Sequence, residues 1–213
     1  MSLGNIILLN GTSSSGKTTI ARALQDVLDT PYLHTGIDQT LIEHLPKGLI
    51  VYSDGVHPAS AEGWLAVFRK DALVQVRIGP VGYQWITGMY RAVAALAEAG
   101  LNVILDDVIY DARVLESAVE TLRAEQVFFV GVRCPLEVAE QRERERGNRA
   151  GGARAFYDLV HTHGVYDLEV DSARYSPDEC AQQIKRGLLT RPTPSAFSRL
   201  RRSCGQPRTE DGR

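Results

Sequence analysis

The sequence predicts an α/β fold, in which a parallel sheet carries helices on both of its faces. Short and almost entirely apolar runs recur along the chain, as in strands that are buried on both faces. Longer stretches with helical periodicity separate these runs, and this alternation is typical of parallel sheets. The chain has 213 residues, 44% of them hydrophobic, which suits one compact domain with a sizeable core.

The first predicted elements surround a glycine-rich turn. Residues 5–10 (NIILLN) form a bare apolar run, which predicts a strand, and residues 17–28 place their apolar side chains on one helical face. A short strand at 32–34 follows. Asp38 then has the position of an N-cap residue, at the start of a helix that ends near residue 45.

Residues 46–80 are the least regular part of the chain. Two candidate strands, 49–52 and 73–78, flank a loop at 53–62. An inserted hairpin and a substrate flap would both give this pattern, so both interpretations stay open.

Helices and strands then alternate as far as residue 189. The predicted elements are the helix 81–99, the strand 101–107, the helix 112–124, the strand 127–133, the helix 135–146, a loop at 147–153, the helix 154–162, the strand 166–170 and the helix 177–189. Residues 1–189 are therefore expected to form one domain. Residues 190–213 have six arginines against two acidic residues and no apolar period, which predicts a basic, disordered tail, with a docking arm as the alternative.

Composition excludes several classes of protein. The formal net charge is −2, so no basic field favours nucleic acid or an anionic membrane as a partner. No basic segment followed by a long apolar run stands at the N-terminus, so neither a secretory signal nor a membrane span is expected. Cys134, Cys180 and Cys204 lack CxxC spacing, which argues against a disulfide framework or a zinc site. We expect a soluble, cytoplasmic protein, and leave a homo-oligomer open.

The strongest motif is GTSSSGKT at residues 11–18, which matches GxxxxGK[ST] between a predicted strand and a predicted helix. Glycines let the backbone curl so that its N–H groups face phosphate oxygens, and the helix N-terminus adds its positive dipole end. Lys17 suits the β- and γ-phosphates, and the Thr18 hydroxyl suits Mg²⁺. The sequence thus predicts a P-loop that binds a nucleoside triphosphate through Gly11, Thr12, Ser13, Ser14, Ser15, Gly16, Lys17, Thr18 and Thr19.

The chain favours a small kinase among P-loop proteins. It has no NKxD motif, as a GTPase would, and it is too short for a large motor ATPase. A small kinase needs an acceptor-side base, a carboxylate for Mg²⁺ and a lid that carries arginines.

Two carboxylate positions supply the first two parts. Asp38 follows the second strand, where ligands bind in open α/β sheets, so it is either the general base or a helix cap. Asp106 and Asp107 end a predicted strand and are candidate metal ligands. Only one of the two need face the metal, because adjacent strand residues point to opposite faces, and the sequence does not decide which.

Four arginines surround the predicted loop at 147–153. Arginine can clamp phosphate oxygens with two parallel hydrogen bonds, which suits a lid that closes over ATP. We therefore expect a lid at residues 142–155 with Arg142, Arg146 and Arg149 at the site, whereas Arg144 fits a solvated helix face.

Several blocks together resemble the chloramphenicol phosphotransferase family, whose members are small P-loop enzymes that phosphorylate a drug hydroxyl. The blocks are the phosphate loop with its strand, GID at 36–38 with LIE at 41–43, VILDDV at 103–108, VGVRC at 130–134, the arginine-rich segment at 139–151, and VH at 160–161 leading to YDLEVD at 166–171. The phosphate loop occurs in many unrelated enzymes, whereas the GVRC and YDLEVD blocks are far more particular.

The resemblance implies an ATP-dependent phosphotransferase with a nucleotide-kinase-like P-loop fold. It implies a five-stranded parallel sheet in the order 2-3-1-4-5, with helices on both faces. It also implies Asp38 as the general base, Lys17 and the lid arginines as further catalytic residues, and Asp171 and Ser172 beside the adenine. ATP and Mg²⁺ are the implied cofactors, and the hydroxyl of chloramphenicol or a related antibiotic is the implied acceptor.

The likeness fades over residues 46–91, where family members build the acceptor pocket, and we treat 46–80 as a variable acceptor-site insertion. One extra residue separates Asp38 from the LIE block. Two other hypotheses therefore stay open: a kinase of a nucleoside, sugar or sugar nucleotide, and a nucleotide-binding regulatory module that has no acceptor.

Overall fold

The computed structural model describes residues 2–40, 42–54, 60–69, 72–147 and 151–204. Its centre is a sheet of five strands, all paired in parallel. The strands are β1 (Ile6–Asn10), β2 (Tyr32–Gly36), β6 (Asn102–Asp107), β7 (Val127–Arg133) and β8 (Leu168–Asp171), in the spatial order β2-β6-β1-β7-β8. Counted in chain order among themselves, these five strands have the predicted order 2-3-1-4-5, which is confirmed.

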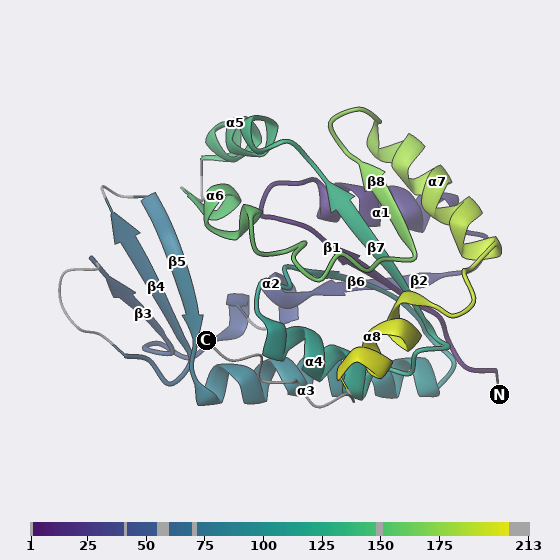
Figure 1. Cartoon of the computed structure of the whole chain (residues 1–213), viewed down its shortest axis with the longest axis horizontal. Coiled ribbons are helices and arrows are strands. Elements are labelled where there is room, and N and C mark those ends of the chain that lie inside the picture. Colours follow the sequence, from purple (N-terminus) through teal and green to yellow (C-terminus); the bar gives the residue numbers. More distant parts are fainter. Residues whose placement is uncertain (1, 41, 55–59, 70–71, 148–150, 205–213) are drawn as a thin grey trace, which may run out of the picture.

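Helices cover both faces of this sheet because its strands are apolar on both faces (Figure 1). In β1, Ile6 and Leu8 pack into one core and Ile7 and Leu9 into the other, and all four are fully buried. The helices α1 (Lys17–Val27) and α7 (Pro177–Leu189) pack together on the second of these cores. The first core lies under α3 (Pro80–Glu98) and α4 (Ala112–Thr121). The predicted three-layer architecture is confirmed.

The described residues between 46 and 80 form a second, three-stranded sheet, which contains an antiparallel strand pair as the hairpin interpretation expected. Its strands β3 (Ile50–Ser53), β4 (Trp64–Arg69) and β5 (Ala72–Ile78) lie in that order, with β4 antiparallel to β5. Strand β4 was not predicted from the sequence. Trp64 is only 4% exposed and packs into the core under α3, so this apolar strand anchors the second sheet to the domain. In Figure 1 the second sheet stands beside the central one, next to the start of α3.

Two predicted helices differ in their bounds. The helix expected at 38–45 is a short α2 (Ile37–Thr40) followed by a 3-10 turn, η1 (Ile42–His44). The predicted lid contains the end of α5 (Leu136–Arg146) and α6 (Gly152–Tyr157), which begins and ends earlier than the helix expected at 154–162. Within the described residues, no helix is long and apolar enough to cross a membrane.

The disordered tail expected from residue 190 is wrong for residues 196–204, which form the helix α8 (Ala196–Cys204). Ala196 and Phe197 are fully buried in the core beside α4, and Leu200 is nearly so. The Arg201 guanidinium donates hydrogen bonds to the carbonyl oxygens of Val119 and Leu122 at the end of α4. Only three apolar residues among many arginines form this contact, which is why the sequence shows no clear period here. Residues 205–213 lie outside the described residues.

The packing of α8 predicts a large effect for Phe197→Ala. Removing a fully buried phenyl ring leaves a cavity, so the free energy of unfolding should fall by about 3–5 kcal/mol in urea denaturation. The control is Arg202→Ala on the exposed side of the same helix, which should change it by less than about 0.5 kcal/mol. Equal and small effects of the two changes would mean that α8 does not pack against the domain.

Candidate active site

The phosphate loop joins the buried end of β1 to the first turn of α1. Gly16 has φ of +91° and Ser14 has φ of +60°, so the backbone curls in the manner that exposes successive N–H groups. A Cβ atom at Gly11 would lie 2.6 Å from the Val132 carbonyl oxygen, so only glycine fits there without a shift. The Lys17 amine is buried and donates to the Thr12 carbonyl oxygen over 2.9 Å, which folds it back over the loop.

The loop fits a phosphate chain. Ser13, Ser14 and Ser15 have buried hydroxyl oxygens without a hydrogen-bond partner among the described residues. Unsatisfied buried donors are costly, so a loop that keeps three of them beside a helix N-terminus and a lysine is suited to an anion. This chemistry fits the phosphates of a nucleotide.

Asp106 is the carboxylate that faces this loop. Its Oδ2 accepts a 2.6 Å hydrogen bond from the Thr18 hydroxyl, and its Oδ1 lies 4.0 Å from Lys17 Nζ. His34 Nε2 lies 3.8 Å from Asp106 Oδ2, too far for a good hydrogen bond but close enough to favour the carboxylate. Burial alone would raise the pKa of Asp106, but His34, Lys17 and Thr18 outweigh it and hold that pKa below its usual value. Thr18 and Asp106 together can hold a divalent cation.

Asp107 points to the other face of the sheet. It is fully buried and accepts hydrogen bonds from the Tyr90 hydroxyl, at 2.6 Å, and from the Val108 N–H. Burial raises the pKa of this carboxyl to about 6, against the opposing effect of these two hydrogen bonds. Of the two candidate metal ligands, Asp106 is the one that faces the loop, because the alternation of side chains along β6 takes Asp107 away from it.

Asp38 lies beside the phosphate loop. It belongs to the first turn of α2, which begins at Ile37, so Asp38 does not precede the helix as the N-cap interpretation required. A small cavity of about 40 Å³ separates it from the loop. The lining residues are Ser13, Ser14, Gly16, Lys17, Thr18, Thr19, Ile37, Asp38, Gln39, Asp106, Val108 and Arg146. One carboxylate from α2, one from β6 and one arginine from α5 thus face the same space.

The lid arginines have different positions. Arg146 lines the cavity next to the loop. Arg142 donates to the Ser172 hydroxyl and carbonyl oxygens, and its Nη1 would be 3.5 Å from a Cβ atom at Gly16. Arg144 is exposed, as expected, and Arg149 lies outside the described residues.

The turn after β8 also touches the loop. The Ser172 hydroxyl donates a 2.6 Å hydrogen bond to the Ser15 carbonyl oxygen. Asp171 Oδ1 accepts from the N–H groups of Ala173 and Arg174, so this carboxylate holds the turn. Ser172 is therefore next to the phosphate loop, and Asp171 supports it.

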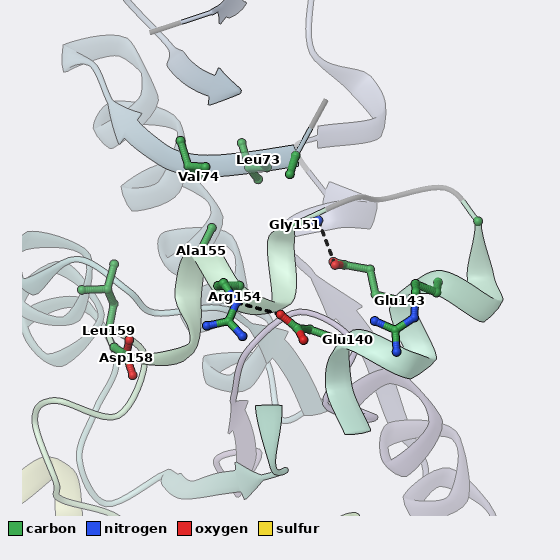
Figure 2. A pocket seen from close by; sticks show the side chains of 12 residues that line it. Leu73, Val74, Glu140, Glu143, Gly151, Arg154, Ala155, Asp158 and Leu159 are labelled. Atoms are coloured by element: carbon green, nitrogen blue, oxygen red, sulfur yellow. Dashed lines mark hydrogen bonds and ion pairs between the residues drawn. The ribbon is translucent and has the colours of Figure 1, made fainter. Parts of the chain in front are cut away.

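Glu143, which was not predicted from the sequence, holds the predicted lid segment together. Its carboxylate is only 5% exposed and accepts hydrogen bonds of 2.9 Å from the N–H groups of Gly151 and Ala153, as Figure 2 shows for Gly151. The Ala153 carbonyl oxygen in turn accepts a 2.7 Å bond from the Thr12 hydroxyl of the phosphate loop. Because Glu143 stands in an alternation of Glu and Arg, it looked like one more solvated helix residue.

Gly151 also links the lid to the second sheet. Its φ is +88°, and a Cβ atom there would lie 2.4 Å from the Leu73 carbonyl oxygen of β5. In Figure 2, α6 lies against β5 on one side and α5 on the other. The lid is thus in contact with the phosphate loop through Thr12 and with β5 through Gly151.

This fold and this site define a P-loop kinase. Solved structures of that class have the same fold at low sequence identity. The APS kinase CysC of Mycobacterium tuberculosis, in complex with AMPPNP and APS, aligns with a TM-score of 0.60 at 16% identity over 89% of this chain and 99% of that one. Shikimate kinase from Acinetobacter baumannii, in complex with shikimate, gives 0.56 at 17% identity over 88% and 94%.

The chain belongs to the chloramphenicol phosphotransferase-like family, whose sequence profile matches residues 4–188. A relative from Mycobacterium tuberculosis, named "Putative O-phosphotransferase Rv2636", is 35% identical over 202 residues, which are 93% of this chain and 88% of the relative. The resemblance seen in the sequence blocks is confirmed.

The buried position of Glu143 predicts that Glu143→Gln weakens the lid. The amide would present an NH₂ group to one of the two backbone N–H donors, which leaves that donor unsatisfied at a cost of about 1–3 kcal/mol. We expect a lower free energy of unfolding in urea and faster limited tryptic cleavage within residues 144–154.

Glu140→Gln is the matched control, because its carboxylate bonds to the exposed Arg154. Breaking such a surface pair should cost less than about 1 kcal/mol and leave the cleavage rate unchanged. Equal effects of the two substitutions would contradict the role of Glu143 in holding the lid.

Proposed function

We propose that this chain transfers the γ-phosphoryl group of ATP to a hydroxyl group of a small molecule, with Asp38 as the general base. The observation that carries the proposal is the shared cavity, which brings the phosphate loop, Asp106 and Asp38 together. As a member of this family with an intact phosphate loop, the chain is an ATP-dependent small-molecule kinase.

The phosphate loop and Lys17 bind and orient the donor. The backbone N–H groups of the loop and the unpartnered serine hydroxyls donate to phosphate oxygens, and Lys17 turns from the Thr12 carbonyl to the β- and γ-phosphates. Thr18 and Asp106 would hold Mg²⁺, which supplies positive charge at the β- and γ-phosphate oxygens when it is bound. The low pKa of Asp106 keeps this ligand ionised.

Asp38 acts on the acceptor side. Its carboxylate takes the proton of the acceptor hydroxyl as that oxygen forms a bond to the γ-phosphorus, while the bond from phosphorus to the β–γ bridging oxygen breaks and ADP leaves. Arg146 lines the same cavity and Arg142 lies beside Gly16, so both can stabilise the charge that spreads over the transferred group. Arg149 is proposed for the same task from its position in the sequence.

The first candidate acceptor is chloramphenicol or a related antibiotic, which follows the name of the family. A solved neighbour, the tunicamycin resistance protein of Deinococcus radiodurans, aligns with a TM-score of 0.57 at 17% identity and is also named for an antibiotic. A metabolite hydroxyl is the alternative, because the second sheet occupies the variable stretch of the chain. Antibiotic resistance is therefore part of the proposal for this protein.

Lys17→Ala tests the donor half of the site. Without the buried amine, the charge on the transferred group loses its main compensation from the chain, and ATP-dependent transfer should fall by at least about 100-fold. The control is Lys185→Ala, which removes an amine bonded to Asp29 at the far end of α1. A Lys17→Ala variant with unchanged turnover would refute the phosphate-loop mechanism.

Asp38→Asn tests the acceptor half. With purified protein, Mg·ATP and chloramphenicol, mass spectrometry should detect one added phosphoryl group for the wild type. The variant should lose about 100- to 10,000-fold in transfer and keep its affinity for nucleotide, because only the base is removed.

Asp26→Asn removes an exposed carboxylate from α1 and should match the wild type. Near-normal transfer by Asp38→Asn would show that Asp38 is not the base. Unchanged chloramphenicol together with transfer to another hydroxyl compound would refute the drug as acceptor and leave the kinase in place.

A further inference from the structure

A cavity of about 620 Å³ lies between β5, the segment that follows β6, and α6. Its size is within the range of pockets that bind small molecules. Its lining residues are Arg69, Val74, Gln75, Val76, Arg77, Ile78, Tyr83, Tyr110, Asp111, Ala155, Phe156 and Leu159. We propose that this cavity holds the acceptor and that Arg69 and Arg77 bind an anionic group, a carboxylate or a phosphate, which the acceptor carries in addition to its reacting hydroxyl. The inference rests on the proposed function and narrows its class of substrate to the metabolite alternative, because chloramphenicol carries neither a carboxylate nor a phosphate.

The cavity is next to the phosphate site. Val108 lines the small cavity of the phosphate loop, and Tyr110 lines the larger one. Two residues of chain span at most about 7 Å, so one short segment forms a wall of both spaces. A small molecule in the larger cavity can therefore extend a hydroxyl towards the phosphate loop and Asp38.

Charge argues for an anion. Arg69 and Arg77 both line the cavity, and within the described residues neither forms an ion pair. The Arg77 Nε donates a 3.3 Å hydrogen bond to Gln75 Oε1. This leaves the two terminal nitrogens of Arg77 for a ligand. Guanidinium groups bind carboxylates and phosphates with paired hydrogen bonds.

Arg69 and Arg77 lie on adjacent antiparallel strands of the second sheet. Arg77 of β5 pairs with Leu65 of β4, four residues before Arg69. Leu65 and Arg69 are thus about 13 Å apart along β4. The side chains of Arg69 and Arg77 can reach one group between them. The register of β4 and β5 shifts between Val67 and Phe68, so the support for a shared ligand is the common lining of the cavity.

The one acidic residue in the lining is already engaged. Asp111 Oδ2 accepts from the Tyr83 hydroxyl at 2.9 Å, and its Oδ1 accepts from the Arg113 N–H. The Arg113 guanidinium lies 4.0 Å from the centre of the Tyr83 ring, which adds positive charge at this end of the cavity. Asp111 thus holds the wall in place, and among the described residues it forms no ion pair with Arg69 or Arg77.

The wall also offers an unused donor. The Tyr110 hydroxyl is buried with no hydrogen-bond partner among the described residues, and its ring packs on Phe156 of α6, with ring centres 4.6 Å apart. Burial raises the pKa of Tyr110 far above its usual value, so the hydroxyl stays protonated and able to donate.

The test measures anion binding to the full chain with its phosphate loop already filled by Mg·AMPPNP. Inorganic phosphate and malonate are titrated separately by isothermal calorimetry, into the wild type, Arg69→Gln, Arg77→Gln and Arg91→Gln. Arg91 is an exposed arginine of α3 outside the cavity, and its substitution removes the same charge. We expect a second anion to bind the wild type, and each cavity variant to weaken it about tenfold, while Arg91→Gln has no such effect.

The two probes distinguish the kind of anion, since preferred binding of malonate indicates a carboxylate and preferred binding of phosphate indicates a phosphate ester. The proposal is overturned if neither anion binds, or if the cavity variants and Arg91→Gln behave alike. The affinity for AMPPNP is measured in the same experiment. If the wild type does not bind AMPPNP, the proposed function is refuted. If it binds AMPPNP but no second anion, only the anionic acceptor is refuted.

Discussion

Strand β1 is paired in parallel on both edges and buried on both faces, and the arrangement of the site depends on this. Register places Asn10 of β1 opposite Asp107 of β6, and Asp106 opposite Gly36 of β2. Parallel strands end at the same edge of a sheet, so the phosphate loop, the Asp106 carboxylate and the segment that carries Asp38 meet there. The Asn10 side chain adds a link by accepting from the Ile109 N–H and donating to Tyr166 and the Val160 carbonyl.

Much of this arrangement could be predicted, because local sequence determines it. The apolar runs predicted the strands of the central sheet. The phosphate-loop pattern between a strand and a helix predicted where the phosphate loop lies. Strand alternation also predicted that only one of Asp106 and Asp107 faces the loop. Which of the two faces the loop depends on which face of β6 packs under α3, where the Tyr90 hydroxyl donates to Asp107. That packing is a tertiary interaction, which the local sequence does not specify.

Other features could not be predicted for the same reason. Glu143 looks like a surface residue until α6 folds back onto it, and its burial comes from two backbone N–H groups that are eight and ten residues away in the chain. The helix α8 is held by Phe197 and Leu200, which pack into the core beside α4. The arginine-rich local sequence gives no sign of this packing site. The strand β4 was missed for a different reason, since its apolar run stands inside the least regular stretch of the sequence.

The contact of Gly151 with β5 has a thermodynamic consequence. This residue is bonded to Glu143 on one side and packed on Leu73 on the other, so it joins the end of α5 to β5 of the second sheet. A ligand that moved one of these two elements would act on the other through this contact. By linkage, if bound nucleotide raises the affinity for a molecule held by the second sheet, that molecule raises the affinity for the nucleotide by the same factor. Since a methyl group would not fit between Gly151 and Leu73, this close contact depends on glycine at that position.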